Sequence, residues 1–168
     1  MIPKEQLITM SERSLGYYFE DYSVGQKMMT RGRTITEADI VAFAGLTGDY
    51  NPMHTDAEYM KTSAFGQRIA HGMLVLSYAV GQVYQLGFLE GRVIAFRGLE
   101  MKFSLPVFIG DTLHVEVEII DKKDMLRLGG GMITAAVKIV NQHGKVVQSG
   151  EWSILVVSRA AEAKDASG

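Results

Sequence analysis

The stretch Ile69-Ala-His-Gly-Met-Leu-Val-Leu-Ser-Tyr-Ala-Val-Gly-Gln-Val-Tyr-Gln-Leu-Gly-Phe-Leu89 contains no Asp, Glu, Lys or Arg. An uncharged segment of about 20 residues is long enough to cross a bilayer as a helix. This one, however, carries polar residues that include His71, Ser77, Gln82 and Gln85. Such a composition suits a helix enclosed by protein better than a helix that faces lipid. We therefore predict a long central helix that the rest of the chain covers.

After Gly91 the pattern changes from helical to β. Four segments are rich in Val, Ile, Thr, Phe and Leu, which favour strands: Val93 to Leu105, Thr112 to Ile120, Met125 to Val140 and Val146 to Val157. The breaks between them have the spacing of hairpins: Pro106 with Gly110-Asp111, Asp121 to Asp124, and Asn141 to Gly144. We predict an α+β fold with an antiparallel sheet wrapped around the central helix, an arrangement known as a hot-dog domain, because it buries the apolar faces of both partners.

The residues before the central helix predict smaller elements. A short strand is expected near Lys27 to Arg33. The segment Thr34-Ile-Thr-Glu37 then predicts a helix start, because a threonine side chain accepts hydrogen bonds from first-turn N–H groups. This helix should end near Gly48, and Asp56 should cap a second short helix.

Length and composition predict one domain. The chain has 168 residues, of which 47% are hydrophobic, enough for one core and too few for two ordinary domains. We expect an N-terminal arm over residues 1–15 and the hot-dog domain over residues 16–157. Residues 158–168 are expected to be a disordered tail, because they lack large apolar side chains.

Charge and cysteine content exclude several functions. The formal net charge is −2, so no basic field attracts nucleic acid or an anionic membrane, and neither partner is expected. The chain has no cysteine, which excludes disulfides and thiolate chemistry. Pro3 and Glu5 interrupt the apolar run that a signal peptide needs, so we expect a cytoplasmic protein.

The strongest candidate for chemistry is Gly48-Asp-Tyr-Asn-Pro-Met-His54, which places a carboxylate and an imidazole on one proline-stiffened loop. Adding water to a double bond conjugated with a carbonyl needs a base for the water and an acid for the α-carbon. Asp49 and His54 are the candidate pair. An aspartate with the ordinary pKa of about 3.9 is a weak base at pH 7, so the role requires burial, which Phe43, Tyr50 and Met53 are expected to provide. The alternative is that Asp49 ties its own turn and His54 is an ordinary loop histidine.

A second candidate motif, Arg68-Ile-Ala-His-Gly-Met73, lies where the central helix should begin. The N-terminus of a helix has unpaired amides and a partial positive charge. The N–H of Gly72 or Met73 is therefore predicted to bind a thioester oxygen as it gains negative charge. We assign Asn51 and His71 to substrate binding with them. A structural reading stays open for Gly72, in which the glycine permits close packing against the sheet.

Two further possibilities carry less weight. Ser77 lies six residues after His71, where its side chain either faces the site or relieves crowding between helix and sheet. A metal site formed by Asp49, His54 and His71 is an alternative, but their spacing matches no familiar ligand pattern. We expect no metal.

The two motifs, together with Lys102-Phe-Ser-Leu-Pro-Val-Phe-Ile-Gly-Asp-Thr112, resemble the MaoC-like dehydratases and (R)-specific enoyl-CoA hydratases. The resemblance implies that Asp49 and His54 act on one catalytic water and that the amide of Gly72 holds the thioester carbonyl. It implies reversible addition of water across a trans-2-enoyl-CoA to give an (R)-3-hydroxyacyl-CoA, with no cofactor besides the coenzyme A of the substrate. Some members have a serine where this chain has Val80, so hydrogen bonding to the site must differ here.

The resemblance also implies a homodimer or a larger assembly of dimers, because a single domain would leave an edge strand exposed. Two other functions remain open. A hot-dog acyl-CoA thioesterase would need a carboxylate and have less use for His54. A non-catalytic acyl or CoA-binding module would have no reason to keep Asp49 and His54 together. The sequence leaves open the length of the acyl chain. It also leaves open whether the thioester is formed with coenzyme A or with an acyl carrier protein.

Overall fold

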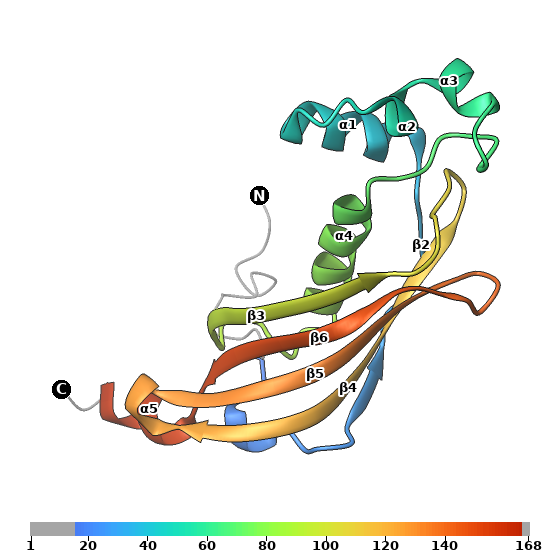
Figure 1. The fold of residues 1–168 in the computed structure, drawn as a ribbon. Coiled ribbons are helices and arrows are strands. Elements are labelled where there is room, and N and C mark those ends of the chain that lie inside the picture. The colour runs from blue at the N-terminus through green and yellow to red at the C-terminus, as the bar shows by residue number, and fades with distance from the viewer. Residues whose placement is uncertain (1–15, 166–168) are drawn as a thin grey trace, which may run out of the picture.

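The computed structural model describes residues 16–165. Its main feature is a curved antiparallel sheet that packs against one long helix (Figure 1). Five of the six strands of the sheet follow the order β1-β4-β5-β6-β3, and the sixth, β2, pairs with β4. The strands are β1 (Lys27–Met29), β2 (Arg33–Thr34), β3 (Val93–Phe103), β4 (Thr112–Met125), β5 (Gly130–Asn141) and β6 (Val146–Val157). The α+β hot-dog fold expected from the sequence is confirmed.

The helices divide into a central helix, a small lobe and a C-terminal element (Figure 1). The central helix is α4 (Gly72–Tyr84), shorter than the uncharged segment that predicts it. The lobe beyond its N-terminal end contains α1 (Glu37–Thr47), α2 (Pro52–Thr55) and α3 (Ala57–Lys61). The remaining helices are the short 3-10 helices η3 (Phe19–Asp21) and η4 (Leu126–Leu128), and α5 (Arg159–Asp165).

The core lies between α4 and the inner face of the sheet. Leu74, Val75 and Val83 of α4 are buried against a cluster that includes Val117 and Ile133 from the sheet. Fully burying a side chain of this size contributes about 1.5–3 kcal/mol. The sequence predicts that the rest of the chain covers the central helix. On the side of α4 that faces away from the sheet, however, part of this apolar helix is exposed. Among the described residues, no helix is long and apolar enough to cross a membrane.

The start signals in the lobe are confirmed. Thr36 caps α1, and its side chain accepts a hydrogen bond from the Asp39 amide while the Asp39 carboxylate accepts one from the Thr36 amide. Gly48 ends α1 with a left-handed φ of 77°, a conformation in which glycine has no steric penalty. Asp56 caps α3 through the Tyr59 amide. Asp49 therefore follows a helix end, as the sequence predicts.

The hairpin between β4 and β5 lies later than predicted. Asp121 to Asp124 continue β4 and pair with Gly131 to Thr134 of β5. The turn instead forms over η4 and Gly129, which has a φ of 76°. A run of charged residues is compatible with a strand when cross-strand pairing is available, and the glycine supplies the left-handed conformation that the turn requires.

The prediction of a disordered tail is wrong over α5. Arg159 forms an ion pair with Asp21 of η3, and Arg92 donates a hydrogen bond of 2.6 Å to Glu162 and another of 2.6 Å to the Tyr18 hydroxyl. The Tyr18 hydroxyl in turn donates to Glu162. These contacts attach a segment without large apolar side chains to the domain. The expected arm over residues 1–15, and residues 166–168, lie outside the described residues.

Candidate active site

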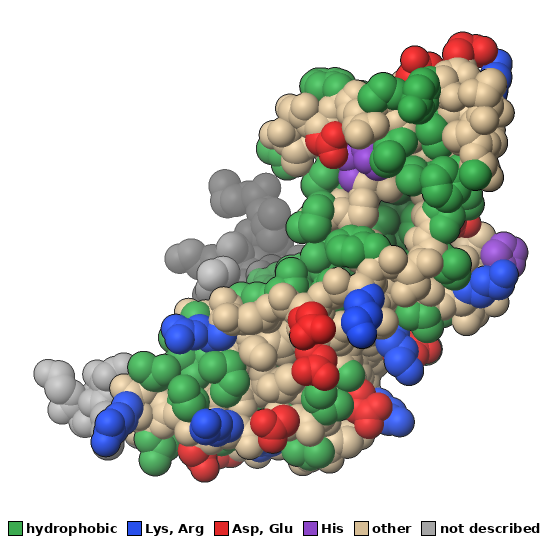
Figure 2. Space-filling model, in the orientation of Figure 1, with side chains coloured by type: hydrophobic (Ala, Val, Ile, Leu, Met, Phe, Trp, Pro, Cys, Tyr) green, Lys and Arg blue, Asp and Glu red, His purple; other side chains and the backbone are tan. Residues whose placement is uncertain are grey.

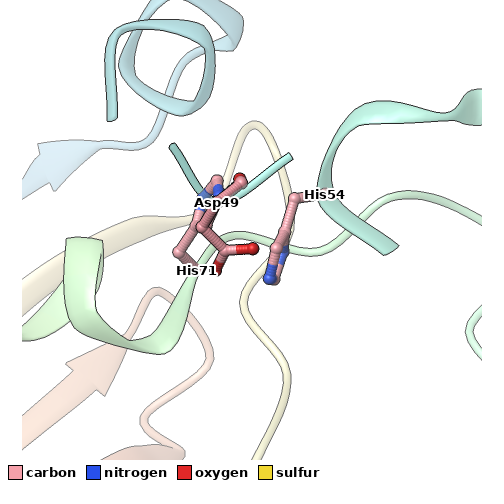
Figure 3. A group of neighbouring side chains, drawn as sticks. All are labelled: Asp49, His54 and His71. Carbon is pink, nitrogen blue, oxygen red and sulfur yellow. The ribbon is translucent and has the colours of Figure 1, made fainter. Parts of the chain in front are cut away.

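Asp49, His54 and His71 come together at the junction of the helical lobe and α4. One side-chain nitrogen or oxygen from each lies within 4.8 Å of the others. Asp49 lies in the loop that follows α1, His54 lies in the short helix α2 rather than in the loop that the sequence predicts, and His71 immediately precedes α4. Figure 3 shows the Asp49 carboxylate turned toward the His54 ring. The fold thus assembles the two motifs that the sequence analysis identifies separately.

Asp49 is held by local hydrogen bonds and is exposed. Its amide donates to the Thr47 hydroxyl at 3.2 Å, and its carboxylate accepts from the Asn51 amide at 3.2 Å. The expected burial by neighbouring apolar side chains is not found, since Tyr50 is 63% exposed and Met53 is 36% exposed. Among the described residues, therefore, the neighbours of Asp49 leave its side chain exposed to water.

His54 is buried, and its proton position follows from its contacts. Its Nδ1 lies 2.8 Å from the Ile69 carbonyl oxygen, which can only accept, so Nδ1 carries the proton. In the neutral ring, Nε2 then has a free lone pair. The Ile69 amide donates to the Met53 carbonyl at 3.1 Å, which joins the same two segments a second time. His54 therefore presents a proton acceptor at a fixed place.

His71 lies against His54. The two rings stack with centroids 3.8 Å apart and an angle of 26° between their planes, and Phe43 of α1 contacts the His71 ring at 5.1 Å. The Nε2 of His71 lies 3.0 Å from the backbone carbonyl oxygen of Asp49. His71 thus contacts both members of the predicted acid–base pair.

This arrangement suits proton transfer better than a shared metal ion. The lone pair of an imidazole nitrogen lies in the plane of its ring, so two stacked, nearly parallel rings direct their lone pairs within two nearly parallel planes. In His71, moreover, Nε2 is occupied by the Asp49 carbonyl and the remaining nitrogen is buried. Coordination by all three residues would require the rings to reorient. The expectation that no metal is bound stays a prediction.

The first turn of α4 offers backbone amides beside His54. The first backbone hydrogen bond of the helix runs from the Val75 amide to the His71 carbonyl, so the preceding amides of Gly72 and Met73 have no acceptor within the helix. A Cβ atom on Gly72 would lie 2.8 Å from two ring atoms of Phe103. The close packing proposed for this glycine is therefore present, and it leaves the amide position compatible with substrate binding.

A cavity of ≈ 520 Å³ adjoins these groups. His54 and Gly72 line it together with apolar side chains that include Phe65, Val75 and Phe103. A space that joins a basic nitrogen, a helix N-terminus and an apolar wall fits a substrate with a polar reactive group and an apolar extension. Asp49 and His71 are not among the residues that line it.

The other predicted site residues have structural contacts. The Asn51 side chain caps α2 by accepting from the Met53 amide at 3.1 Å, and Ser77 donates to the Met73 carbonyl at 2.8 Å within α4. Neither contact tests a role in substrate binding. Gln148 of β6 was not predicted, yet it is buried, lines the cavity and donates from Nε2 to the Gly72 carbonyl at 2.9 Å. Its polarity alone could not have identified it, because Ser149 and Glu151 of the same strand are polar as well.

An ion pair attaches the loop before α4 to the lobe. Arg68 donates two hydrogen bonds to Glu37 of α1, one of them 2.8 Å long. The guanidinium of Arg68 lowers the pKa of Glu37. The Glu37 side chain is half exposed, so the pair contributes at most about 1 kcal/mol. Its bidentate geometry fixes orientation rather than adding much stability.

The chain is similar to several known proteins. A family model described as "MaoC like domain" matches residues 20–142. The (R)-specific enoyl-CoA hydratase of Aeromonas caviae is 36% identical over 132 residues, which cover 79% of this chain and 93% of that protein. The solved structure of the (R)-hydratase from A. caviae has a TM-score of 0.71 at 32% identity, covering 81% of this chain and 98% of that one. A monoamine oxidase regulatory protein from Archaeoglobus fulgidus has a TM-score of 0.80 at 41% identity, with 86% and 97% covered.

Proposed function

The chain belongs to the MaoC-like domain family, and from this membership and the site geometry we propose that it is an (R)-specific enoyl-CoA hydratase. It would add water reversibly across a trans-2-enoyl-CoA to give an (R)-3-hydroxyacyl-CoA. The observation that carries the proposal is the convergence of Asp49 with His54 beside the first turn of α4. The reaction requires no redox cofactor, and coenzyme A enters only as part of the substrate.

The proposed chemistry needs one water between Asp49 and His54. As the water oxygen bonds to C3 of the enoyl group, one proton leaves the water for the acid–base pair, and negative charge moves to the thioester oxygen. The pair then supplies one proton to C2, so its protonation state is unchanged after a turnover. The free Nε2 lone pair of His54 supports its part in this exchange.

The amide of Gly72 is the proposed donor to the thioester oxygen. A preorganised donor at a developing negative charge typically lowers the barrier by about 3 kcal/mol. Gly72 and His54 line the same cavity, so a thioester there would lie beside both. The apolar wall of the cavity is the proposed site of the acyl chain.

A homodimer is also proposed. Met73, Val80 and Tyr84 form an exposed face of α4. Strand β3, whose one partner among the described strands is β6, exposes Phe96 and Phe103 nearby. Figure 2 shows hydrophobic side chains gathered in the hollow between the helical lobe and the sheet. A monomer rarely leaves such an apolar face next to an unpaired strand edge. A second copy would cover both.

The test follows the loss of enoyl-thioester absorbance with crotonyl-CoA and a longer enoyl-CoA, and identifies the stereochemistry of the product. We expect Asp49→Asn and His54→Ala each to reduce the rate by roughly 10²- to 10⁴-fold without unfolding the protein. Asp124→Asn and His143→Ala, which change exposed residues far along the chain, serve as matched controls.

The products distinguish the alternatives. An (R)-3-hydroxyacyl product that depends on Asp49 and His54 supports the proposal. Release of free coenzyme A thiol would instead identify a thioesterase. If neither reaction occurs with any acyl group tested, a non-catalytic acyl-binding protein becomes the better description.

A further inference from the structure

His71 is the most enclosed titratable side chain of the cluster, with only 2% of its surface exposed. It is absent from the lining of the cavity that His54 and Gly72 share. A role in contacting substrate, which the sequence suggests, therefore has no support from its position. Its contacts are with the protein: the backbone of Asp49, the ring of His54 and the ring of Phe43.

The hydrogen bond of His71 determines which nitrogen carries the proton. The Asp49 carbonyl oxygen can only accept, so Nε2 of His71 must donate. The other nitrogen, Nδ1, is buried and has no partner among the described residues. A proton on Nδ1 would be a buried donor without an acceptor, which is more costly than an unused lone pair. The contacts thus favour one neutral form, with the proton on Nε2.

The same ring limits where His54 and Asp49 can lie. Its face stacks on His54 at a centroid distance of 3.8 Å, while its edge holds the Asp49 backbone at 3.0 Å. His71 also directly precedes α4, whose first turn carries the amide of Gly72. One side chain therefore connects all three groups to which the proposed reaction assigns a role.

We propose that His71 is a positioning residue, a neutral imidazole with its proton on Nε2 that sets the separation of Asp49 and His54 without touching substrate. It acts through the Asp49 carbonyl and through the stacked face of His54. For its effect on catalysis the inference rests on the proposed hydratase function. The proton position can be tested independently of any activity.

The first experiment records long-range ¹⁵N–¹H correlations of the imidazole rings in the wild-type protein near neutral pH. The chain has four histidines, so single substitutions assign each ring. We expect His71 to report a proton on Nε2 and His54 to report a proton on Nδ1, opposite forms in one spectrum. A His71 ring protonated on Nδ1, alone or in addition, would overturn the inference whether or not the protein is a hydratase.

The second experiment compares His71→Phe, which keeps a flat ring and loses both nitrogens, with His71→Gln, which restores an N–H donor. We expect His71→Phe to lower kcat roughly 10- to 100-fold, the range for small misplacements of catalytic groups, while KM stays within about twofold. His71→Gln should recover part of the loss. The control His143→Phe makes the same change at an exposed hairpin position.

The kinetic outcomes are separable. A folded His71→Phe protein with wild-type kcat, or a change in KM alone, would refute positioning. If that variant does not fold, the wild-type spectrum still decides the proton position. If the wild type hydrates no enoyl-CoA, the hydratase proposal fails, and the spectrum still shows whether His71 holds the Asp49 carbonyl as inferred.

Discussion

Gln148 of β6 donates a hydrogen bond of 2.9 Å from Nε2 to the backbone carbonyl of Gly72 in the first turn of α4. The contact joins the sheet to the part of the helix that the proposed reaction uses. The other polar end of this amide, Oε1, is buried and has no partner among the described residues. Gln148 thus bears an unsatisfied acceptor while it orients the turn.

The variant Gln148→Leu is expected to change the stability of the protein little and to lower its activity. It removes the side-chain hydrogen bond to the Gly72 carbonyl, which as part of α4 also accepts within the helix, and it removes the unsatisfied Oε1. The free energy of unfolding should therefore change by only about 1 kcal/mol. The rate of enoyl-CoA hydration should fall several-fold, because the turn that carries the Gly72 amide loses the hydrogen bond that orients it. Denaturant unfolding and initial rates measure the two effects. A large loss of stability with unchanged kcat per folded molecule would contradict the orienting role.

Gly72→Ala is expected to destabilise the protein by about 1–3 kcal/mol, the usual cost of overpacking. The new Cβ would lie 2.8 Å from the Phe103 ring. A second change, Phe103→Leu, should relieve part of this cost, and a double-mutant cycle of unfolding free energies measures the coupling.

Gly81→Ala is the matched control within the same helix. Nothing lies within 4 Å of a Cβ at that position. Alanine should therefore stabilise α4 by about 0.5–1 kcal/mol through helix propensity. Equal effects at Gly72 and Gly81 would show that contact with Phe103 does not matter.

The docking of α5 should be lost in acid. The hydrogen bond from Arg159 lowers the pKa of Asp21, and the hydrogen bonds from Tyr18 and Arg92 lower the pKa of Glu162. A carboxyl group whose pKa is lower in the folded state stabilises it above the unfolded pKa, and this contribution disappears as the pH falls through the folded pKa. Both groups should therefore support docking at pH 7, and their contribution should disappear as the pH falls from the ordinary carboxyl range through the lowered pKa of each group.

Substitution of Arg159 tests this dependence. Arg159→Ala should increase amide exchange in α5 at pH 7, and the difference from wild type should shrink as the pH falls through the lowered pKa of Asp21, because the carboxyl then loses its charge in the wild-type protein as well. Arg127→Ala, which removes the same charge from an exposed position, controls for net charge. An effect of Arg159→Ala that is independent of pH would exclude the ion pair as its cause.

If the protein forms the proposed dimer, a charged substitution on the exposed face of α4 should disrupt it. Val80 is 42% exposed there, whereas Leu46 at the end of α1 is 82% exposed. Val80→Arg should convert a dimer to a monomer, because it would bury an unpaired charge, and Leu46→Arg should not. Light scattering after size-exclusion chromatography measures the mass. A monomeric wild type at micromolar concentration would contradict the proposal.

Local signals predicted much of the fold. The uncharged segment correctly located α4, and the β-rich segment Val146 to Val157 coincides with β6. The start of α1 at the Thr36 cap and its end at Gly48 could be predicted from the sequence, because each depends on residues within one turn. The hairpin after β4 and the helix α5 were missed, because cross-strand pairing and ion pairs with η3 override local preference.

The sequence by itself determined the fold class, the short segment that carries Asp49 and His54, and the helix start at Gly72, since hydrophobic pattern, turn residues and caps act over a few neighbouring positions. Only the tertiary structure decided that His71 stacks on His54, that Ile69 and Asp49 carbonyls dictate opposite proton positions on the two rings, and that Gln148 reaches Gly72. These contacts join residues 15 to 76 positions apart. Their partners are chosen by how the helix and the sheet pack, which no local pattern encodes.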